Sequence, residues 1–182
     1  MTIRLLTAAD LEKFPTSLPS GDVWYELDDG VLVVHSPSTA RQGRCQALVF
    51  SHLHMMEASR ADRVLGRAGI ILRRNPDRVV GPAVSLLGRD QWPPKVSAED
   101  FLETIPKLIV EIRSKYDTSP EVGSKVAEYL AAGAVEVWVL DPETQTIAKH
   151  RADGMWSSAE SEILESELLP GFYVRVDHFF AE

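Results

Sequence analysis

The chain has 182 residues, of which 45% are hydrophobic and 25% charged, and this composition is typical of one globular domain covering residues 1–182. Its formal net charge of −8 at pH 7 argues against a generally basic protein that coats nucleic acid, although arginines are concentrated in residues 60–78. The single cysteine, Cys45, excludes an intramolecular disulfide framework and a multi-cysteine metal site. We therefore expect a reducing, cytoplasmic location. No membrane association is expected, because no apolar run approaches the roughly 20 residues that span a bilayer.

The first half of the chain predicts a short helix, a hairpin, a long helix and several strands. Thr7 is typical of a helix cap, with acidic residues in the turn that follows. Residues Trp24–Val34 predict a β-hairpin, because Asp29-Gly30 is a strong two-residue turn signal. The elements expected next are a helix from about Ala40 to Ser59 and strands at Arg63–Gly66, Gly69–Arg74 and Val79–Leu87.

The second half begins with Gln91–Pro106, which is rich in tryptophan and proline and is expected to be an irregular surface excursion. An apolar strand at Leu108–Ile112 follows, and it is expected to be buried on both faces. A helix capped at Thr118 or Ser119 is expected next, and Gly133 is expected to end it. The following strand, Val135–Asp141, is expected to lie parallel to Leu108–Ile112 and to pair with Thr144–His150. Short antiparallel strands are expected after that. The order predicts an α/β fold in which helices flank a mixed sheet.

Glu111 interrupts the apolar strand, and a carboxylate in a buried strand is costly unless a cation, a metal or hydrogen-bond donors meet it. One interpretation is that Glu111 belongs to a functional site. The other is that it is a structural carboxylate paired with Arg113 or Lys115.

Two carboxylates and a nearby lysine form the set that metal-dependent phosphodiester cleavage uses. Glu26, on the first hairpin strand, and Lys125, on the helix after Glu111, are the further candidates. Each also has a structural explanation: Glu26 as an exposed residue beside a turn, and Lys125 as the partner of Glu121 one helical turn away. Tyr129 is expected in the core, with its hydroxyl group reaching water.

Five motifs in register resemble the Uma family, a group of restriction-endonuclease-like proteins in the PD-(D/E)XK nuclease superfamily. The resemblance runs from about Thr7 to Gly171, and it implies a restriction-endonuclease-like mixed sheet with an N-terminal hairpin and C-terminal antiparallel strands. The motifs are Trp24-Tyr-Glu-Leu-Asp-Asp-Gly30, Val80-Gly-Pro-Ala-Val-Ser85, Leu108-Ile-Val-Glu-Ile-Arg-Ser114, Lys125-Val-Ala-Glu-Tyr129 and Gly133-Ala-Val-Glu-Val-Trp-Val-Leu-Asp-Pro142.

The resemblance implies roles for individual residues. Glu111 would bind a divalent metal, Mg²⁺ or Mn²⁺, together with the Ile112 carbonyl group. Arg113 stands where the superfamily has its lysine, and the family's lysine on the next helix corresponds to Lys125. Glu26 would be a further acidic member of the site.

One departure concerns the metal directly. Where the family has proline followed by aspartate, this chain has Pro82-Ala83, so the catalytic set Glu26, Ala83, Glu111 and Lys125 lacks one carboxylate. Metal binding is therefore expected to be weakened and cleavage impaired. Ala83 is explained either by natural loss in a degenerate member or by an engineered inactivating substitution. Gln42 also stands where the family tends to have a histidine.

The predicted function is that of a metal-dependent endonuclease acting on DNA, with a homodimer as a candidate assembly. The alternative is a non-catalytic nucleic-acid-binding or protein-interaction module that has kept the nuclease fold. Both predict that the carboxylates of Glu26 and Glu111, the Lys125 ammonium group and the Ala83 methyl group converge on one pocket.

Overall fold

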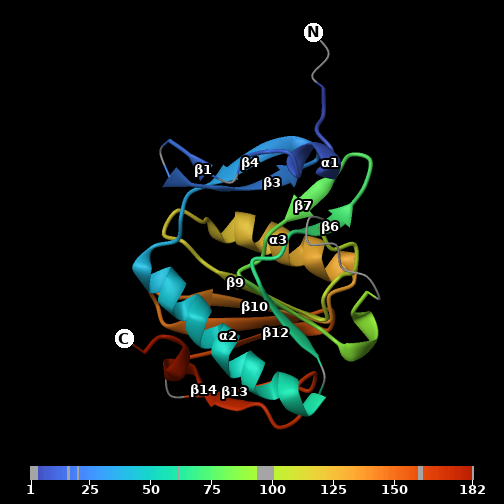
Figure 1. Cartoon of the computed structure of the whole chain (residues 1–182). Helices are drawn as coiled ribbons and strands as arrows, with labels where there is room; N and C mark the ends of the chain where they lie inside the picture. The colour runs from blue at the N-terminus through green and yellow to red at the C-terminus, as the bar shows by residue number, and fades with distance from the viewer. Residues whose placement is uncertain are drawn as a thin grey trace.

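The fold places a large mixed sheet between two helices, with a smaller hairpin-containing sheet beside it (Figure 1). It is taken from a computed structural model. The structure describes residues 4–15, 17–19, 21–60, 62–93, 101–159 and 162–181, without the side chains of residues 57–60.

The larger sheet has six strands in the order β12-β11-β10-β9-β8-β5. Only β9 and β10 are parallel, and the helix α3 connects them as a crossover, while the other neighbours are antiparallel. The strands are β5 (Arg63–Gly66), β8 (Val84–Leu87), β9 (Leu108–Ile112), β10 (Glu136–Asp141), β11 (Thr146–Arg151) and β12 (Gly154–Ser158). This confirms the predicted mixed α/β architecture.

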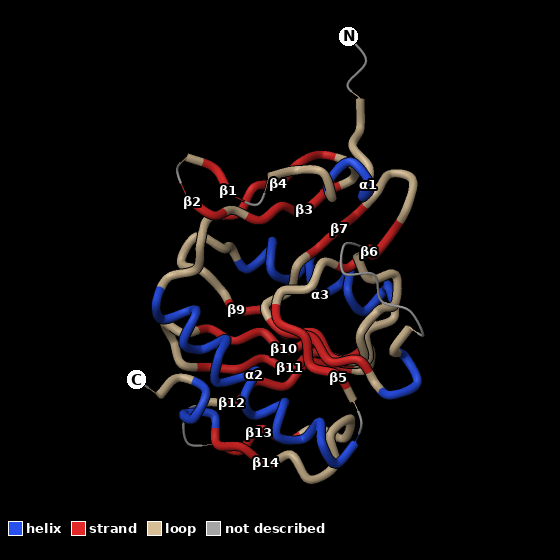
Figure 2. Tube along the Cα trace, in the orientation of Figure 1, coloured by secondary structure: helices blue, strands red, loops and turns tan. Residues whose placement is uncertain are grey.

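The smaller sheet has four strands in the order β4-β3-β7-β6 and lies above α3 in the view of Figure 2. Its strands are β3 (Trp24–Asp28), β4 (Val31–His35), β6 (Ile70–Arg73) and β7 (Arg78–Val80). The predicted hairpin turn is present, with Asp29 and Gly30 at φ values of 50° and 77°, as a two-residue turn of this kind requires. A side chain at position 30 would also meet Leu5 Cβ at 2.8 Å.

Three α-helices and short terminal elements complete the described part of the fold. The helices are α1 (Ala8–Leu11), α2 (Ala40–Arg60) and α3 (Ser119–Ala132). Two 3₁₀ turns, η1 (Arg89–Gln91) and η2 (Val176–Phe179), lie after β8 and near the C-terminus. Two small two-stranded pairs are β1 (Ser17–Leu18) with β2 (Gly21–Asp22), and β13 (Ile163–Glu165) with β14 (Tyr173–Arg175). Among the described residues, no helix is long and apolar enough to cross a membrane.

The two long helices pack on opposite faces of the larger sheet. On one face, Leu53 of α2 joins Leu108 and Val110 of β9 in a core that extends to Phe179 near the C-terminus. On the other face, Ile109 of β9 packs with α3 and with β6 of the smaller sheet. Alternate residues of β9 therefore face opposite layers, as the prediction of a strand buried on both faces requires.

Two sequence-based expectations were wrong. Val79–Leu87 is not one strand, because it divides into β7 and β8, which belong to different sheets. Pro82 lies between them and has no backbone N–H to continue a ladder. The predicted surface excursion is also partly core: Leu102 is buried and bridges to Ile70. Residues 94–100 of that excursion lie outside the described residues.

Candidate functional site

Glu111 lies on β9, on the face that α3 covers. Residues of β9 alternate between the two faces of the sheet, and Ile109, two residues earlier, packs against α3. The Glu111 carboxylate therefore points toward α3, where its side chain keeps an exposed fraction of 18%. Burial raises the pKa of Glu111, opposed by the charge of Lys125 and a hydrogen bond from Tyr129. This carboxylate is costly to ionise, which is typical of residues kept for function.

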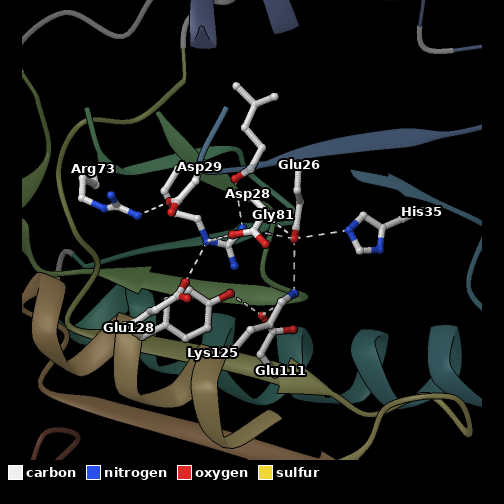
Figure 3. A network of polar contacts seen from close by, with 12 residues as sticks. Glu26, Asp28, Asp29, His35, Arg73, Gly81, Glu111, Lys125 and Glu128 are labelled. Carbon is white, nitrogen blue, oxygen red and sulfur yellow. Dashed lines mark hydrogen bonds and ion pairs between the residues drawn. The ribbon is translucent and has the colours of Figure 1, made fainter. Parts of the chain in front are cut away.

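Glu26 is the second carboxylate of the site and is held by groups from three elements (Figure 3). The Gly81 N–H donates to Oε1 at 3.0 Å, and His35 Nε2 of β4 lies 3.2 Å from Oε2. Burial alone would raise the pKa of Glu26, but His35, Lys125 and the Gly81 N–H together lower it to about 2. Glu26 is only 3% exposed, so it is not the surface residue that the structural alternative required.

Lys125 of α3 bridges the two carboxylates. Its Nζ lies 3.3 Å from Glu26 Oε2 and 3.8 Å from Glu111 Oε1. Burial lowers the pKa of Lys125, but the charges of Glu111 and Glu26 outweigh this, so the pKa is raised and the ammonium group stays protonated. The alternative pairing with Glu121 was wrong, because Glu121 instead forms the capping box of α3 with Thr118.

Tyr129, one helical turn after Lys125, completes the first layer of contacts. Its hydroxyl group donates a hydrogen bond to Glu111 Oε1, and the ring is fully buried. The expectation that this hydroxyl group reaches water was therefore wrong. The structural alternative that pairs Glu111 with Arg113 was also wrong, because Arg113 instead forms an ion pair with Asp141. The spacing of Lys125 and Tyr129 on one helix face could have revealed both partners of Glu111.

Three of the four predicted residues line one cavity of about 360 Å³: Glu26, Glu111 and Lys125. Ile112 lines it as well. Ala83 is not among the lining residues, and only 5% of it is exposed. The expected convergence of all four groups is thus only partly met.

Ala83 nevertheless directly precedes β8, the strand that neighbours the Glu111 strand β9 in the sheet. Strands β8 and β9 are antiparallel, with Val84 opposite Val110. Ala83 precedes β8 and is not itself paired, but continuing this register by one residue would put it opposite Glu111, on the same face of the sheet. Side chains directly opposite each other have Cβ atoms about 4.5–5.5 Å apart, so an aspartate at position 83 would bring its carboxylate beside that of Glu111.

Sequence reasoning missed His35 as a partner of Glu26. The hairpin register pairs Glu26 with Val33, and His35 lies two residues further along the same face. That position is readable from the Asp29-Gly30 turn. Gln42, at the family's histidine position, donates from Nε2 to the Arg113 carbonyl group and lines a groove that adjoins the cavity.

The donor chemistry of the cavity suits a hard divalent cation, but the number of ligands is small. Carboxylate and carbonyl oxygens are the ligands that Mg²⁺ and Mn²⁺ prefer. Within the described part of the chain, no group of three or more His, Cys, Asp or Glu side chains is placed to hold a metal. Of the predicted metal ligands, Glu111 and Ile112 line the cavity, and Ala83 has no side-chain oxygen to add to them.

The family described as Uma2, putative restriction endonuclease, matches residues 9–177. The chain belongs to this family. A comparison with curated proteins gives no match. Among solved structures, the fold is similar to a protein from Anabaena variabilis ATCC 29413 described as a putative nuclease, with a TM-score of 0.78 and 15% identity over 97% of this chain and 98% of that one. Uma2 membership confirms the predicted family, and the structural likeness shows that this chain shares its mixed α/β fold with that protein.

Proposed function

We propose that the Uma2 site described above is a metal-dependent phosphodiesterase site for DNA, impaired in this chain by Ala83. The observation that carries the proposal is the Glu26–Lys125–Glu111 cluster lining one cavity, in which the half-buried Lys125 bridges two carboxylates. Uma2 membership supports a nuclease-like activity for such a cluster. DNA as substrate and a metal cofactor are our proposals.

Each residue has a distinct role in this proposal. Glu111 and the Ile112 carbonyl group would hold Mg²⁺ or Mn²⁺, which when bound would polarise the phosphate and acidify a water molecule. Lys125, held protonated by its two carboxylates, would donate hydrogen bonds to the phosphoryl oxygens as negative charge develops there. Glu26 stays ionised because its pKa is about 2, and it orients the Lys125 ammonium group toward the cavity.

A second candidate function is that of a nucleic-acid-binding module without catalysis. Ala83 favours it, because the proposed metal site then lacks one carboxylate, and Lys125 already lies between the two that remain. The two functions differ in one respect: only the first is recovered when the missing carboxylate is restored.

The test is a nicking assay on supercoiled DNA with Mg²⁺ or Mn²⁺, using the protein, the variant Ala83→Asp and the double variant A83D/K125M. We expect trace nicking or none by the protein, clear nicking by Ala83→Asp, and loss of that gain in the double variant. The K125M change keeps an unbranched side chain of similar shape, one atom shorter, and removes its charge. Absence of nicking by Ala83→Asp with either metal would remove the basis of the nuclease proposal.

A further inference from the structure

Arg67 lies at the edge of the candidate site and takes no part in the cluster described so far. It follows β5, and its guanidinium carbon lies 3.8 Å from the centroid of the Trp24 ring. Its Nη2 donates to Ser38 Oγ at 3.0 Å and to Gln46 Oε1 at 3.3 Å. A flat cation stacked on an indole ring and anchored by two neutral acceptors is held in one orientation.

Arg67 also borders the position of the missing aspartate. Its backbone N–H donates to the Ala83 carbonyl oxygen at 3.2 Å, and its Cγ lies beside Gly81, whose N–H holds Glu26. The residue has a φ of 46°, an uncommon conformation for an arginine. The fold thus directs this side chain along the β7–β8 connection toward the groove that contains Glu111 and Lys125.

The guanidinium group of Arg67 has no carboxylate within ion-pair distance among the described residues, although it is half-buried. Burial lowers the pKa of Arg67, opposed by the more distant charges of Glu111 and Glu26. A half-buried cation with only neutral partners is costly unless an anion completes it. By contrast, Arg113 on the wall of this groove and Arg78 on the wall of the adjoining cavity each have a carboxylate partner.

We propose that Arg67, stacked on Trp24, is a phosphate-binding residue that holds one backbone phosphate of a DNA strand beside Glu111 and Lys125. The proposal rests on the proposed function for its ligand, but it does not need cleavage or a metal. The groove is lined by Trp24, Arg67, Glu111 and Lys125, so a phosphate on Arg67 would place the neighbouring strand across the carboxylate cluster. Guanidinium geometry suits two phosphate oxygens at once.

The experiment measures binding of a short labelled DNA duplex, and of the same strand alone, in chelator between about 50 and about 200 mM salt. The protein is compared with Arg67→Gln, with Arg67→Lys, and with Arg63→Gln as a matched control. Arg63 is the first residue of β5, the strand that Arg67 follows, and it also lies near a tryptophan. That tryptophan is Trp92, and neither Arg63 nor Trp92 lines the groove. Arg67→Gln and Arg63→Gln each remove one positive charge, so a difference between them reports on position and not on net charge.

Loss of one phosphate contact should flatten the slope of log K against log salt by about 0.9 for the duplex and about 0.7 for the single strand. We expect this for Arg67→Gln, with binding weakened roughly tenfold at about 50 mM salt. Arg67→Lys should keep the slope and bind more weakly than the protein, which serves as the second test if Arg67→Gln melts early. Arg63→Gln should keep the slope and the affinity.

Binding by Arg67→Gln with an unchanged slope and affinity would overturn the inference and leave the proposed function standing. An equal loss in Arg63→Gln would also overturn it, because general charge attraction would then explain the effect. Failure of the protein to bind either form of DNA would overturn the inference together with the DNA-directed function.

Discussion

Replacing Glu26 by glutamine tests the electrostatics of the site most sharply, because the expected loss of stability is set by the pKa of one group. The pKa of Glu26 is lowered from 4.5 to about 2 in the fold. At about 1.4 kcal/mol for each pKa unit, the ionised carboxylate contributes roughly 3 kcal/mol to the free energy of unfolding at neutral pH. Glutamine keeps the shape and an acceptor for the Gly81 N–H, but it loses the charge that Lys125 and His35 meet.

The sign of the pH dependence follows from the direction of that change. Because the folded pKa lies below the unfolded value of 4.5, the stabilisation is present above about pH 4.5 and is lost as the pH falls toward 2. Glu26→Gln should therefore lower the melting temperature by roughly 6–12 °C at pH 7 for a chain of this size. The difference between the protein and the variant should narrow by about 2 kcal/mol when the pH is lowered to about 3.

Urea unfolding at several pH values, supported by thermal melts, gives the measurement. Glu143→Gln is the matched control, since Glu143 pairs with Arg41 on the surface, where both side chains are more than half exposed. Exposed pairs contribute about 0–1 kcal/mol, so this variant should change stability little at any pH. A Glu26→Gln variant as stable as the protein at pH 7, or a difference independent of pH, would refute the electrostatic account of Glu26.

Two further predictions concern the groups around Glu111. Since burial raises the pKa of Glu111, ionisation of this carboxylate opposes folding, and Glu111→Gln should be at least as stable as the protein at pH 8. This advantage in the free energy of unfolding should shrink toward pH 4. Urea unfolding at both pH values measures it, and a large loss of stability at pH 8 would contradict the prediction. Tyr129→Phe should cost about 1–3 kcal/mol because it removes the donor to Glu111 Oε1, and a double-mutant cycle with Glu111→Gln should give a coupling of about 0.5 kcal/mol or more; simple additivity would refute a direct bond.

Local signals were sufficient for much of the fold. The Asp29-Gly30 turn predicted the position of the hairpin. Thr118 and Gly133 mark the two ends of α3 as predicted, Thr118 through a capping box and Gly133 through a left-handed conformation at φ 115°. The parallel pairing of β9 and β10 followed from the short crossover between them. These features depend on residues close together in the sequence, which is why they could be read from it.

Features that depend on distant segments could not be read in the same way. The burial of Glu26 is created by Gly81 and Lys125, which approach from a different strand connection and from α3. The division at Pro82 depends on β7 joining one sheet and β8 another. The stacking of Arg67 on Trp24 likewise joins the end of β5 to the start of β3, and only the folded chain brings them together.

We propose that Ala83 occupies the place of a metal-binding carboxylate beside Glu111, and Mn²⁺ binding tests this role most directly. Electron paramagnetic resonance titration of Mn²⁺ would compare the protein, Ala83→Asp and A83D/E111Q. We predict weak binding by the protein, binding by Ala83→Asp tighter by tenfold or more (about 1.4 kcal/mol), and loss of this gain in the double variant. Equal Mn²⁺ affinity of the protein and Ala83→Asp would contradict the claim.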